Sequence, residues 1–358
     1  MQRTLRSLLA LALLVAACGD TAMPQPGEGR GDGDEGDGDG DGDGDGDGDG
    51  DGDGDGDGDG DGDGDTTGDG DGDVTGDGGT GDGDGDTPVP SGAGPKIPAA
   101  SMTCPSLKSG TQTIMGLETK IVAGTPSKDG KGPLLIYWHG TGSSPDWELG
   151  TGFGGLLPKS VQDDIVAQGG MIVAPHDPAD PAPGRDGKDV TGGKVWFTTH
   201  DFSYADLIVA CAVKNYGIDP KRIYTTGCSA GGLMAGVMEI QHGDYLAAMT
   251  SNSGGLTTKF GFTAPNYVAP VLLMYGDPSK DMVGIAFETT SNNLSDLVRS
   301  KGGFVVKCKH DQGHCEAPAD LQAAAWQFMK DHPFGITKSP YATKGLPASF
   351  PDYCEIVK

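Results

Sequence analysis

An aspartate–glycine repeat that runs from residue 31 to residue 86 sets the first limit on what this chain can fold into. The repeat has almost no apolar side chains to bury in a core, and its negative charges repel one another. We therefore expect residues 19–95 to form a disordered acidic tether. The alternating aspartates could hold calcium weakly, but a solvated linker is favoured, because the repeat lacks the closing glutamate of a calcium-binding loop.

The acidity of the chain is concentrated in this tether. Residues 1–95 contain 27 of the 52 acidic residues and 3 of the 25 basic residues, which leaves residues 96–358 with a net charge of −3. These remaining residues, about 260 in number, are enough for one α/β domain. Nucleic-acid binding requires a basic patch, and a nearly neutral domain of this kind predicts no nucleic-acid partner.

The N-terminus has the pattern of an export signal. Two arginines precede an apolar run from Leu8 to Ala17, which is too short to cross a bilayer as a helix. The end of the run, Leu14–Cys18, resembles the lipobox of bacterial lipoproteins. This resemblance implies that residues 1–18 are a signal peptide and that Cys18 is acylated, so that the exported protein is held at a bacterial membrane or cell surface by its lipid anchor alone. An ordinary cleaved signal is the alternative.

Strand and helix patterns alternate through the rest of the chain. We expect strands at 134–138, 171–174, 222–226, 246–250, 270–275 and 303–309, and helices at 160–168, 203–216, 230–240, 285–300 and 318–331. Ser160 is the expected N-cap of the first helix. This alternation predicts an α/β fold in which helices cover both faces of a mostly parallel central sheet. Residues 175–200, rich in proline, glycine and aspartate, predict an excursion over the surface.

A serine motif stands between two of these elements, the strand 222–226 and the helix that follows it. Gly227–Gly231 matches the pattern Gly-x-Ser-x-Gly, which forms a sharp turn when a strand precedes it and a helix follows it. The turn exposes the Ser229 hydroxyl and directs the Ala230 N–H and the positive end of the helix dipole at the same site. Ser229 is therefore the candidate nucleophile.

A serine hydroxyl needs a base, and in α/β-hydrolases the chain order is serine, acid, histidine. Of the four histidines downstream of Ser229, His310 and His314 flank the loop after the strand 303–309. His314 is favoured because the preceding glycine permits a sharp loop, whereas His310 is expected to support its neighbour. His242 is expected at the surface, and His332 is expected to be exposed or to cap a helix.

Two aspartates could supply the acid after the strand 270–275. Asp277 directly follows the strand and precedes a proline, which is typical of a turn. Asp281 stands several residues later before an apolar pair, as the acid does in many α/β-hydrolases, and is favoured. Its role would be to accept a hydrogen bond from the imidazole and to stabilise the cation that forms.

The loop that follows the strand 134–138 is the candidate oxyanion loop. Trp138–Gly142 resembles the His-Gly loops of lipases and esterases, in which small residues let a backbone N–H approach the substrate oxygen. Thr141 is the expected donor from this loop and Ala230 the other, whereas His139 is expected to orient the loop. Three aromatic residues, Trp147, Trp196 and Phe197, either line an acyl pocket or pack beneath a loop.

Six cysteines follow Cys18, and an even number in an exported domain suggests disulfides. They are Cys104, Cys211, Cys228, Cys308, Cys315 and Cys354. Cys228 precedes the candidate nucleophile and Cys315 follows the candidate base, so a bridge between them would join the two loops. The other four allow three connectivities, among which a Cys104–Cys354 bridge would tie the two ends of the domain together.

These motifs carry a family resemblance. The Cys-Ser, Asp and His-Cys arrangement resembles that of tannases and fungal feruloyl esterases. The broader pattern over about residues 130–330, including the run 216–224 into the serine, is similar to the polyhydroxybutyrate depolymerase and feruloyl esterase group of carbohydrate esterase family one. The resemblance implies an α/β-hydrolase fold, a triad of Ser229, Asp281 and His314, and no metal or cofactor.

The function that this pattern predicts is exported hydrolysis of carboxylic esters through an acyl-enzyme. The resemblance implies feruloyl or acetyl esters of polysaccharide, or a polyhydroxyalkanoate polyester, as the substrate. A long tether suits a polymeric substrate. A serine peptidase with the same fold is one alternative, and a non-catalytic surface-binding lipoprotein is another.

Overall fold

The computed structural model describes residues 94–150, 157–176, 196, 199–257 and 267–358. The expected signal peptide, Cys18, the tether and most of the excursion at 175–200 lie outside these residues. Within the described ranges, no helix is both long enough and apolar enough to cross a membrane.

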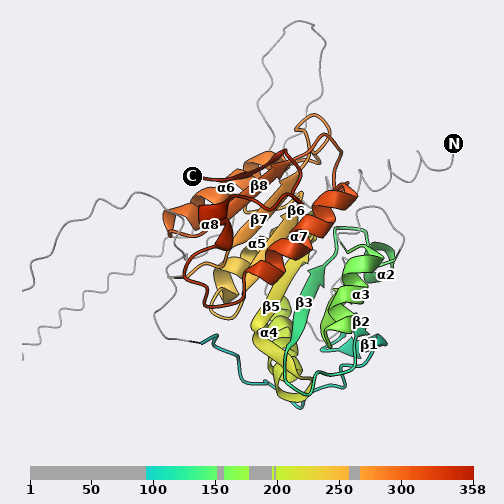
Figure 1. Ribbon diagram of the computed structural model, residues 1–358. Coiled ribbons are helices and arrows are strands. Elements are labelled where there is room, and N and C mark those ends of the chain that lie inside the picture. The colour runs from blue at the N-terminus through green and yellow to red at the C-terminus, as the bar shows by residue number, and fades with distance from the viewer. Residues whose placement is uncertain (1–93, 151–156, 177–195, 197–198, 258–266) are drawn as a thin grey trace, which may run out of the picture. The chain divides into compact units, whose positions relative to one another are not determined.

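The nine strands among the described residues form one sheet in the order β1-β2-β4-β3-β5-β6-β7-β8-β9 (Figure 1). Their bounds are β1 Gly110–Ile114, β2 Leu117–Ala123, β3 Gly132–Trp138, β4 Met171–His176, β5 Ile218–Gly227, β6 Ala248–Asn252, β7 Val271–Tyr275, β8 Val305–Lys309 and β9 Cys354–Ile356. Neighbours from β4 through β3 to β8 pair in parallel, whereas β1–β2, β2–β4 and β8–β9 pair antiparallel. The predicted mostly parallel sheet is confirmed.

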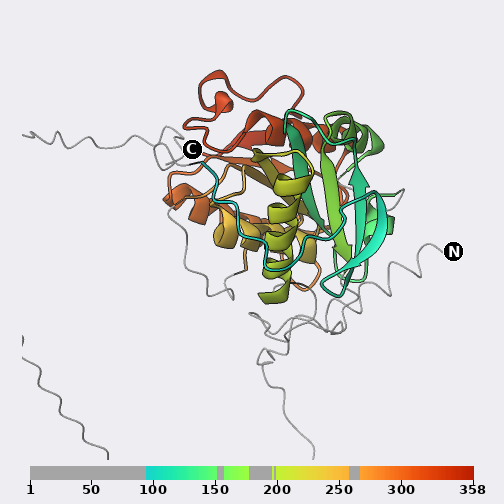
Figure 2. The ribbon, with the colours of Figure 1, turned by 90° about the horizontal axis from the view of Figure 1, so that it is seen from below.

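Helices cover both faces of this sheet, as expected (Figure 2). They are α2 Pro145–Glu148, α3 Lys159–Ala167, α4 Thr199–Asn215, α5 Ala230–His242, α6 Phe287–Ser300, α7 Ala319–Asp331 and α8 Pro340–Lys344. On one face, the Trp326 indole of α7 donates to the Asp164 carboxylate of α3 (2.7 Å). On the other, α5 lies beside α4, since the Tyr245 hydroxyl just after α5 donates to Asp206 of α4 (3.1 Å).

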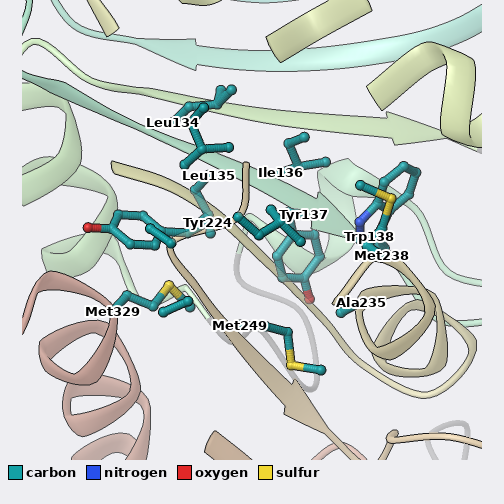
Figure 3. Close-up of a cluster of buried hydrophobic side chains, with 14 of the residues drawn as sticks. Leu134, Leu135, Ile136, Tyr137, Trp138, Tyr224, Ala235, Met238, Met249 and Met329 are labelled. Atoms are coloured by element: carbon teal, nitrogen blue, oxygen red, sulfur yellow. The ribbon is translucent and has the colours of Figure 1, made fainter. Parts of the chain in front are cut away.

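Strand β3 lies at the centre of the hydrophobic core. All of its side chains from Leu134 to Trp138 are fully buried, and Figure 3 shows them together with Met238 of α5 and Met329 of α7. A parallel strand with helices on both faces has no solvent-facing side, so apolar residues occupy every position rather than every second one. The continuous apolar run is explained by this two-sided burial.

The strands at the sheet edges were not predicted, and four of the five predicted helices start one to four residues from their expected positions, most of all α4, which begins at Thr199 rather than at 203. Strand β1 is mostly exposed, so its polar sequence Gly-Thr-Gln-Thr-Ile has no apolar alternation to detect. Helix α3 begins at Lys159 with Pro158 in the N-cap position, so the expected capping role of Ser160 is wrong. The Pro158 carbonyl accepts from the Val161 and Gln162 N–H groups, and no side chain caps this helix start.

The strand register brings the functional loops to one edge. Trp138 pairs with Gly227, so β3 and β5 end together, and Tyr275 pairs with Lys309, so β7 and β8 end together. The bridge between Cys228 and Asn252 and the pairing of Asn252 with Met274 connect these two pairs of strands at the same edge. Open parallel sheets bind ligands at this carboxyl edge, where their loops converge.

Three disulfides join the described residues. The predicted Cys228–Cys315 bridge is present. The suggested Cys104–Cys354 bridge is wrong. Instead, Cys104 pairs with Cys211 of α4, and Cys308 of β8 pairs with Cys354, which faces it across the antiparallel β8–β9 ladder. The missed strand β9 explains the error, because its pairing with β8 decides which cysteine Cys354 can reach.

We predict that replacing Cys104 and Cys211 together by alanine lowers the free energy of unfolding by about 3–4 kcal/mol, because the bridge closes a long loop in the unfolded chain. The two cysteines are 107 residues apart. The Cys308→Ala/Cys354→Ala variant, with a separation of 46 residues, is expected to lose less. Urea unfolding under oxidising conditions measures both losses, and an unchanged midpoint for the first variant would contradict the account.

Candidate active site

The turn that carries Ser229 joins the end of β5 to the start of α5. Ser229 is the N-cap residue of α5, with φ 55° and ψ −123°, a backbone conformation that residues with side chains rarely adopt. Its N–H donates to the Asn252 carbonyl (3.1 Å), and its own carbonyl accepts from the Leu233 N–H (2.9 Å). Hydrogen bonds on both sides therefore hold a strained turn in place.

Two glycines make this turn sterically feasible. A Cβ atom on Gly231 would lie 1.9 Å from the Trp138 carbonyl oxygen, and a Cβ atom on Gly227 would lie 2.4 Å from the same oxygen. Both distances are far below van der Waals contact, so only glycine permits the backbones of the turn and of β3 to approach so closely. The small residues predicted on either side of the serine are explained by this contact.

The candidate base and acid are in direct contact. His314 Nδ1 lies 2.7 Å from Asp281 Oδ1, and the Asp281 side chain is buried at this edge of the sheet. Asp277, the alternative acid, instead accepts from the Ser279 N–H (2.9 Å), as a turn residue does. The structure thus brings together the pair that the sequence analysis favoured.

Ser253 supports this pair and was not identified from the sequence. Its hydroxyl donates to Asp281 Oδ2 (3.0 Å) and accepts from the Cys315 N–H (3.0 Å). The Gly276 N–H donates to the same carboxylate oxygen (2.8 Å). Both oxygens of Asp281 are therefore held, and Ser253 also links the acid to the loop that carries His314. A serine that follows a buried strand at the carboxyl edge was the available signal.

Two further contacts orient the His314 ring. Phe287, the first residue of α6, packs against it with ring centroids 4.6 Å apart and an interplanar angle of 30°. The neighbouring Cys315 is bridged to Cys228, the residue before Ser229. The imidazole is thus packed on one side, and its loop is covalently joined to the serine turn.

The reactive atoms of Ser229 and His314 remain uncommitted. Within the described part of the chain, neither Ser229 Oγ nor His314 Nε2 has a hydrogen-bond partner, although both are buried. They are therefore not hydrogen-bonded to each other here. Catalytic hydrogen bonds of this kind are often long in the absence of substrate and shorten when it binds.

The candidate oxyanion loop, predicted at Trp138–Gly142, occupies residues 139–143 between β3 and α2 and lies directly against the serine. A Cβ atom on Gly140 would lie 3.2 Å from the Ser229 Cβ. Among the described residues, neither the Thr141 N–H nor the Ala230 N–H is matched with an acceptor. The first N–H groups of a helix have no intrahelical partner, which leaves Ala230 free to bind a substrate oxygen. Both expected donors are thus available.

Trp196 packs beneath the oxyanion loop. Its indole N–H donates to the His139 carbonyl (2.8 Å), and its ring lies edge-on to Trp138, with centroids 5.0 Å apart. Trp196 is fully buried, so the structure favours packing over a pocket-lining role for it. His139 Nδ1 lies 2.7 Å from the Gly140 carbonyl oxygen, as expected of a histidine that orients this loop. Phe197 lies outside the described residues.

Glu148, the last residue of α2, is a second residue that the sequence analysis missed. Its side chain is only 4% exposed. Oε1 accepts from the Gly140 N–H (2.9 Å), and Oε2 accepts from the Tyr137 hydroxyl. Burial raises the pKa of this carboxyl to about 7, and the hydrogen bonds oppose that rise only in part.

His310, the alternative base, forms no hydrogen bond or ion pair with Asp281 among the described residues. It is buried, and its Nδ1 accepts from the Gln312 N–H (3.3 Å). Burial lowers its pKa. It supports the loop after β8, which agrees with the role expected for it.

Two other histidines are more buried than expected. His332 does cap α7, but its nitrogens lie 2.7 Å from the Phe328 carbonyl and 2.7 Å from the Ser339 hydroxyl, and it is fully buried. His242 lies 3.2 Å from an Asp206 carboxylate oxygen, with only 15% of its side chain exposed. The expected exposure of His242 is therefore wrong, because α4 packs over it.

One cluster of potential metal ligands occurs among the described residues, and it coincides with this site. Atoms of Cys228, His314 and Cys315 lie within 4.8 Å of one another. The metal-binding form of cysteine is the thiolate, whereas these two sulfurs are joined in a disulfide. In this oxidised state the cluster offers only one nitrogen ligand.

Comparisons with known proteins agree with this architecture. No protein-family model matches the chain. A curated relative, "Putative esterase NocK" from Nocardia uniformis subsp. tsuyamanensis, is 27% identical over 158 residues, which are 43% of this chain and 42% of that protein. The match thus spans less than half the length of the relative.

Solved structures share the fold at low sequence identity. The structures of pOPH and sOPH align with TM-scores of 0.54 and 0.52, each at 16% identity. The alignments cover 71% and 72% of this chain and 96% of each of those chains. Together with the sheet order, they show that the described domain has the α/β-hydrolase fold.

We predict that Gly231→Ala destabilises the protein by about 3 kcal/mol or prevents folding, because the added methyl group would overlap the Trp138 carbonyl oxygen. Gly94→Ala is the matched control, since a Cβ atom there meets no atom within 4 Å. Thermal unfolding measured by circular dichroism compares the two. Equal melting temperatures would show that β3 and the serine turn do not approach as closely as described.

Proposed function

We propose that this protein is a serine esterase that cleaves carboxylic esters through an acyl-enzyme intermediate. The observation that carries the proposal is the placement of Ser229 on a strained strand–helix turn, beside a buried Asp281–His314 pair that leaves His314 Nε2 free. The roles of nucleophile, base and orienting acid are those of the serine hydrolase triad.

In the proposed reaction, Ser229 Oγ attacks the ester carbonyl while His314 Nε2 takes the hydroxyl proton. Asp281 accepts from Nδ1 and stabilises the imidazolium that forms. The Thr141 and Ala230 N–H groups donate to the carbonyl oxygen as it becomes negative, and each such donor is worth about 3 kcal/mol in the transition state. His314 then protonates the leaving alcohol, and water, activated by the same base, releases the acid.

Exposed apolar side chains beside the site favour an apolar or polymeric ester. Three large apolar side chains in the described residues are more than half exposed: Met102, Trp147 and Met282. Trp147 lies in α2, which follows the oxyanion loop, and Met282 directly follows Asp281. We propose that Trp147 and Met282 contact the apolar part of the substrate, which would be a polyester or an aromatic acyl ester.

The N-terminal sequence supports the same substrate class. We propose that Cys18 carries a lipid and that residues 19–95 act as a tether that holds the exported enzyme at a membrane or cell surface. The domain could then reach over an insoluble polymer without leaving the cell. The feruloyl or acetyl polysaccharide esters and the polyhydroxyalkanoates implied by the family resemblance are both substrates of this physical kind.

We predict that the purified protein hydrolyses p-nitrophenyl butyrate and that Ser229→Ala lowers kcat by at least about 10⁴-fold, because the acyl-enzyme can no longer form. Ser253→Ala retains the nucleophile and is expected to lose less. A panel of p-nitrophenyl acetate, methyl ferulate, polyhydroxybutyrate film and a peptide amide identifies the substrate class. Cleavage of the peptide alone would support a peptidase, and no turnover of any substrate would support a binding protein.

We also predict that Trp147→Ala and Met282→Ser reduce release of soluble products from polyester film at least threefold but leave p-nitrophenyl butyrate turnover within twofold. The two side chains would contact the polymer surface rather than the reacting ester. Met102→Ser is the control, because Met102 is equally exposed but far from the site in sequence. Equal losses on film and soluble ester, or an equal effect of the control, would contradict this role.

A further inference from the structure

Glu148 is a buried carboxyl that the proposed reaction does not use, although it lies at the oxyanion loop. We propose that Glu148 is a positioning residue, which holds the Gly140 N–H so that the neighbouring Thr141 N–H is presented to the ester oxygen at Ser229. The inference rests on the proposed esterase function, because it assigns the residue a part in that reaction.

The position of Glu148 follows from the local chain path. The oxyanion loop leaves β3 and is followed at once by the short helix α2, which is capped by Ser144, whose hydroxyl accepts from the Trp147 N–H. This turn returns the Glu148 side chain to the start of the loop. There, one carboxylate oxygen contacts the loop at Gly140, and the other contacts the sheet at Tyr137. The carboxyl therefore links the loop to the buried strand β3.

Three peptide groups at the start of the loop have hydrogen-bond partners. The His139 carbonyl accepts from the Trp196 indole, and the Gly140 carbonyl accepts from the Ser143 N–H (3.1 Å). The Gly140 N–H is committed to Glu148. Within the described residues, the next donors along the loop are the Thr141 and Gly142 N–H groups, and neither is matched with an acceptor. Thr141 directly follows Gly140, so fixing the Gly140 peptide groups constrains the Thr141 N–H first.

Glu148 and Ser229 both lie close to Gly140 of the loop. A Cβ atom on Gly140 would lie 3.2 Å from the Ser229 Cβ and 3.7 Å from Glu148 Oε1. Because Thr141 is the next residue, a shift of the loop at Gly140 would move the Thr141 N–H relative to Ser229. Misplacement of a catalytic group by about 1 Å can cost about 10²-fold in rate.

A buried carboxyl costs free energy, which is unusual for a residue with only a structural role. Moving a carboxyl out of water costs free energy unless its oxygens are hydrogen-bonded, and here both are. Its raised pKa, about 7, shows that the charged form is only partly compensated. A glutamine would keep an acceptor for the Gly140 N–H without that charge, and its amide N–H would donate to the Tyr137 hydroxyl oxygen in place of the present bond from Tyr137.

The test measures kcat and KM of the full-length protein with p-nitrophenyl butyrate for the wild type, Glu148→Gln, Glu148→Leu and Glu148→Ala. An alkylboronic acid serves as a second probe, because its tetrahedral serine adduct places an oxygen where the oxyanion forms. Tyr137→Phe tests the other end of the link, since it removes the contact of the carboxyl with β3 and leaves the Gly140 contact. Melting temperatures are recorded for every variant.

We expect Glu148→Ala and Glu148→Leu to lower kcat by about 10- to 100-fold with KM changed by less than about threefold, and to weaken boronic acid binding by the same factor as kcat/KM. Glu148→Gln should remain within about threefold of the wild type, whereas Tyr137→Phe should lower kcat less than Glu148→Leu does, because it removes only the contact of the carboxyl with β3. Glu148→Leu keeps the volume of the site filled, so it serves the same comparison if the alanine variant does not fold.

Two results would overturn the inference alone. The first is wild-type kcat in the leucine and alanine variants, and the second is an equal loss in Glu148→Gln and Glu148→Leu, which would indicate a requirement for charge rather than for an acceptor. An inactive wild type, or a Ser229→Ala variant as active as the wild type, would instead overturn the esterase proposal and this inference with it.

Discussion

The close approach of β3 to the serine turn is the constraint on which the rest of the site depends. The Trp138 carbonyl lies so near the backbone of Gly227 and Gly231 that a single methyl group would not fit. This contact fixes the end of β3, and hence the oxyanion loop, against the turn that carries Ser229. The dihedral strain at Ser229 is sustained because parallel pairing on both sides of β5 holds the flanking backbone.

A buried polar network builds the second half of the site. Asp281 accepts from His314, Ser253 and Gly276, so its charge is surrounded by donors rather than left unpaired in the core. The Cys228–Cys315 bridge ties the same loop to the serine turn. Together they hold four loops, which follow β5, β6, β7 and β8, in one fixed relation, and fixed geometry is what a pre-organised catalytic site requires.

The features of the structure that could be predicted from sequence are those that depend on neighbouring residues in the chain. The apolar run of β3 and the glycines around Ser229 report burial and close backbone approach at their own positions. Ser253 and Glu148 could not be found in this way, because a serine after a strand and a glutamate in a short helix are common. Their roles arise only because the sheet order places β3 and β6 on either side of β5, which leads into the serine turn. The Cys308–Cys354 pair was missed for the same reason, since it depends on the register of an unpredicted edge strand.

The central claim is that Ser229 is the nucleophile and that His314 activates it. The most direct measurement is labelling of the full-length protein with a fluorophosphonate, followed by digestion and mass spectrometry of the modified peptide. The account predicts a single label on Ser229, and a labelling rate that falls at least about 100-fold in His314→Ala, because the general base is lost. A label on another residue, or an unchanged rate in that variant, would contradict it.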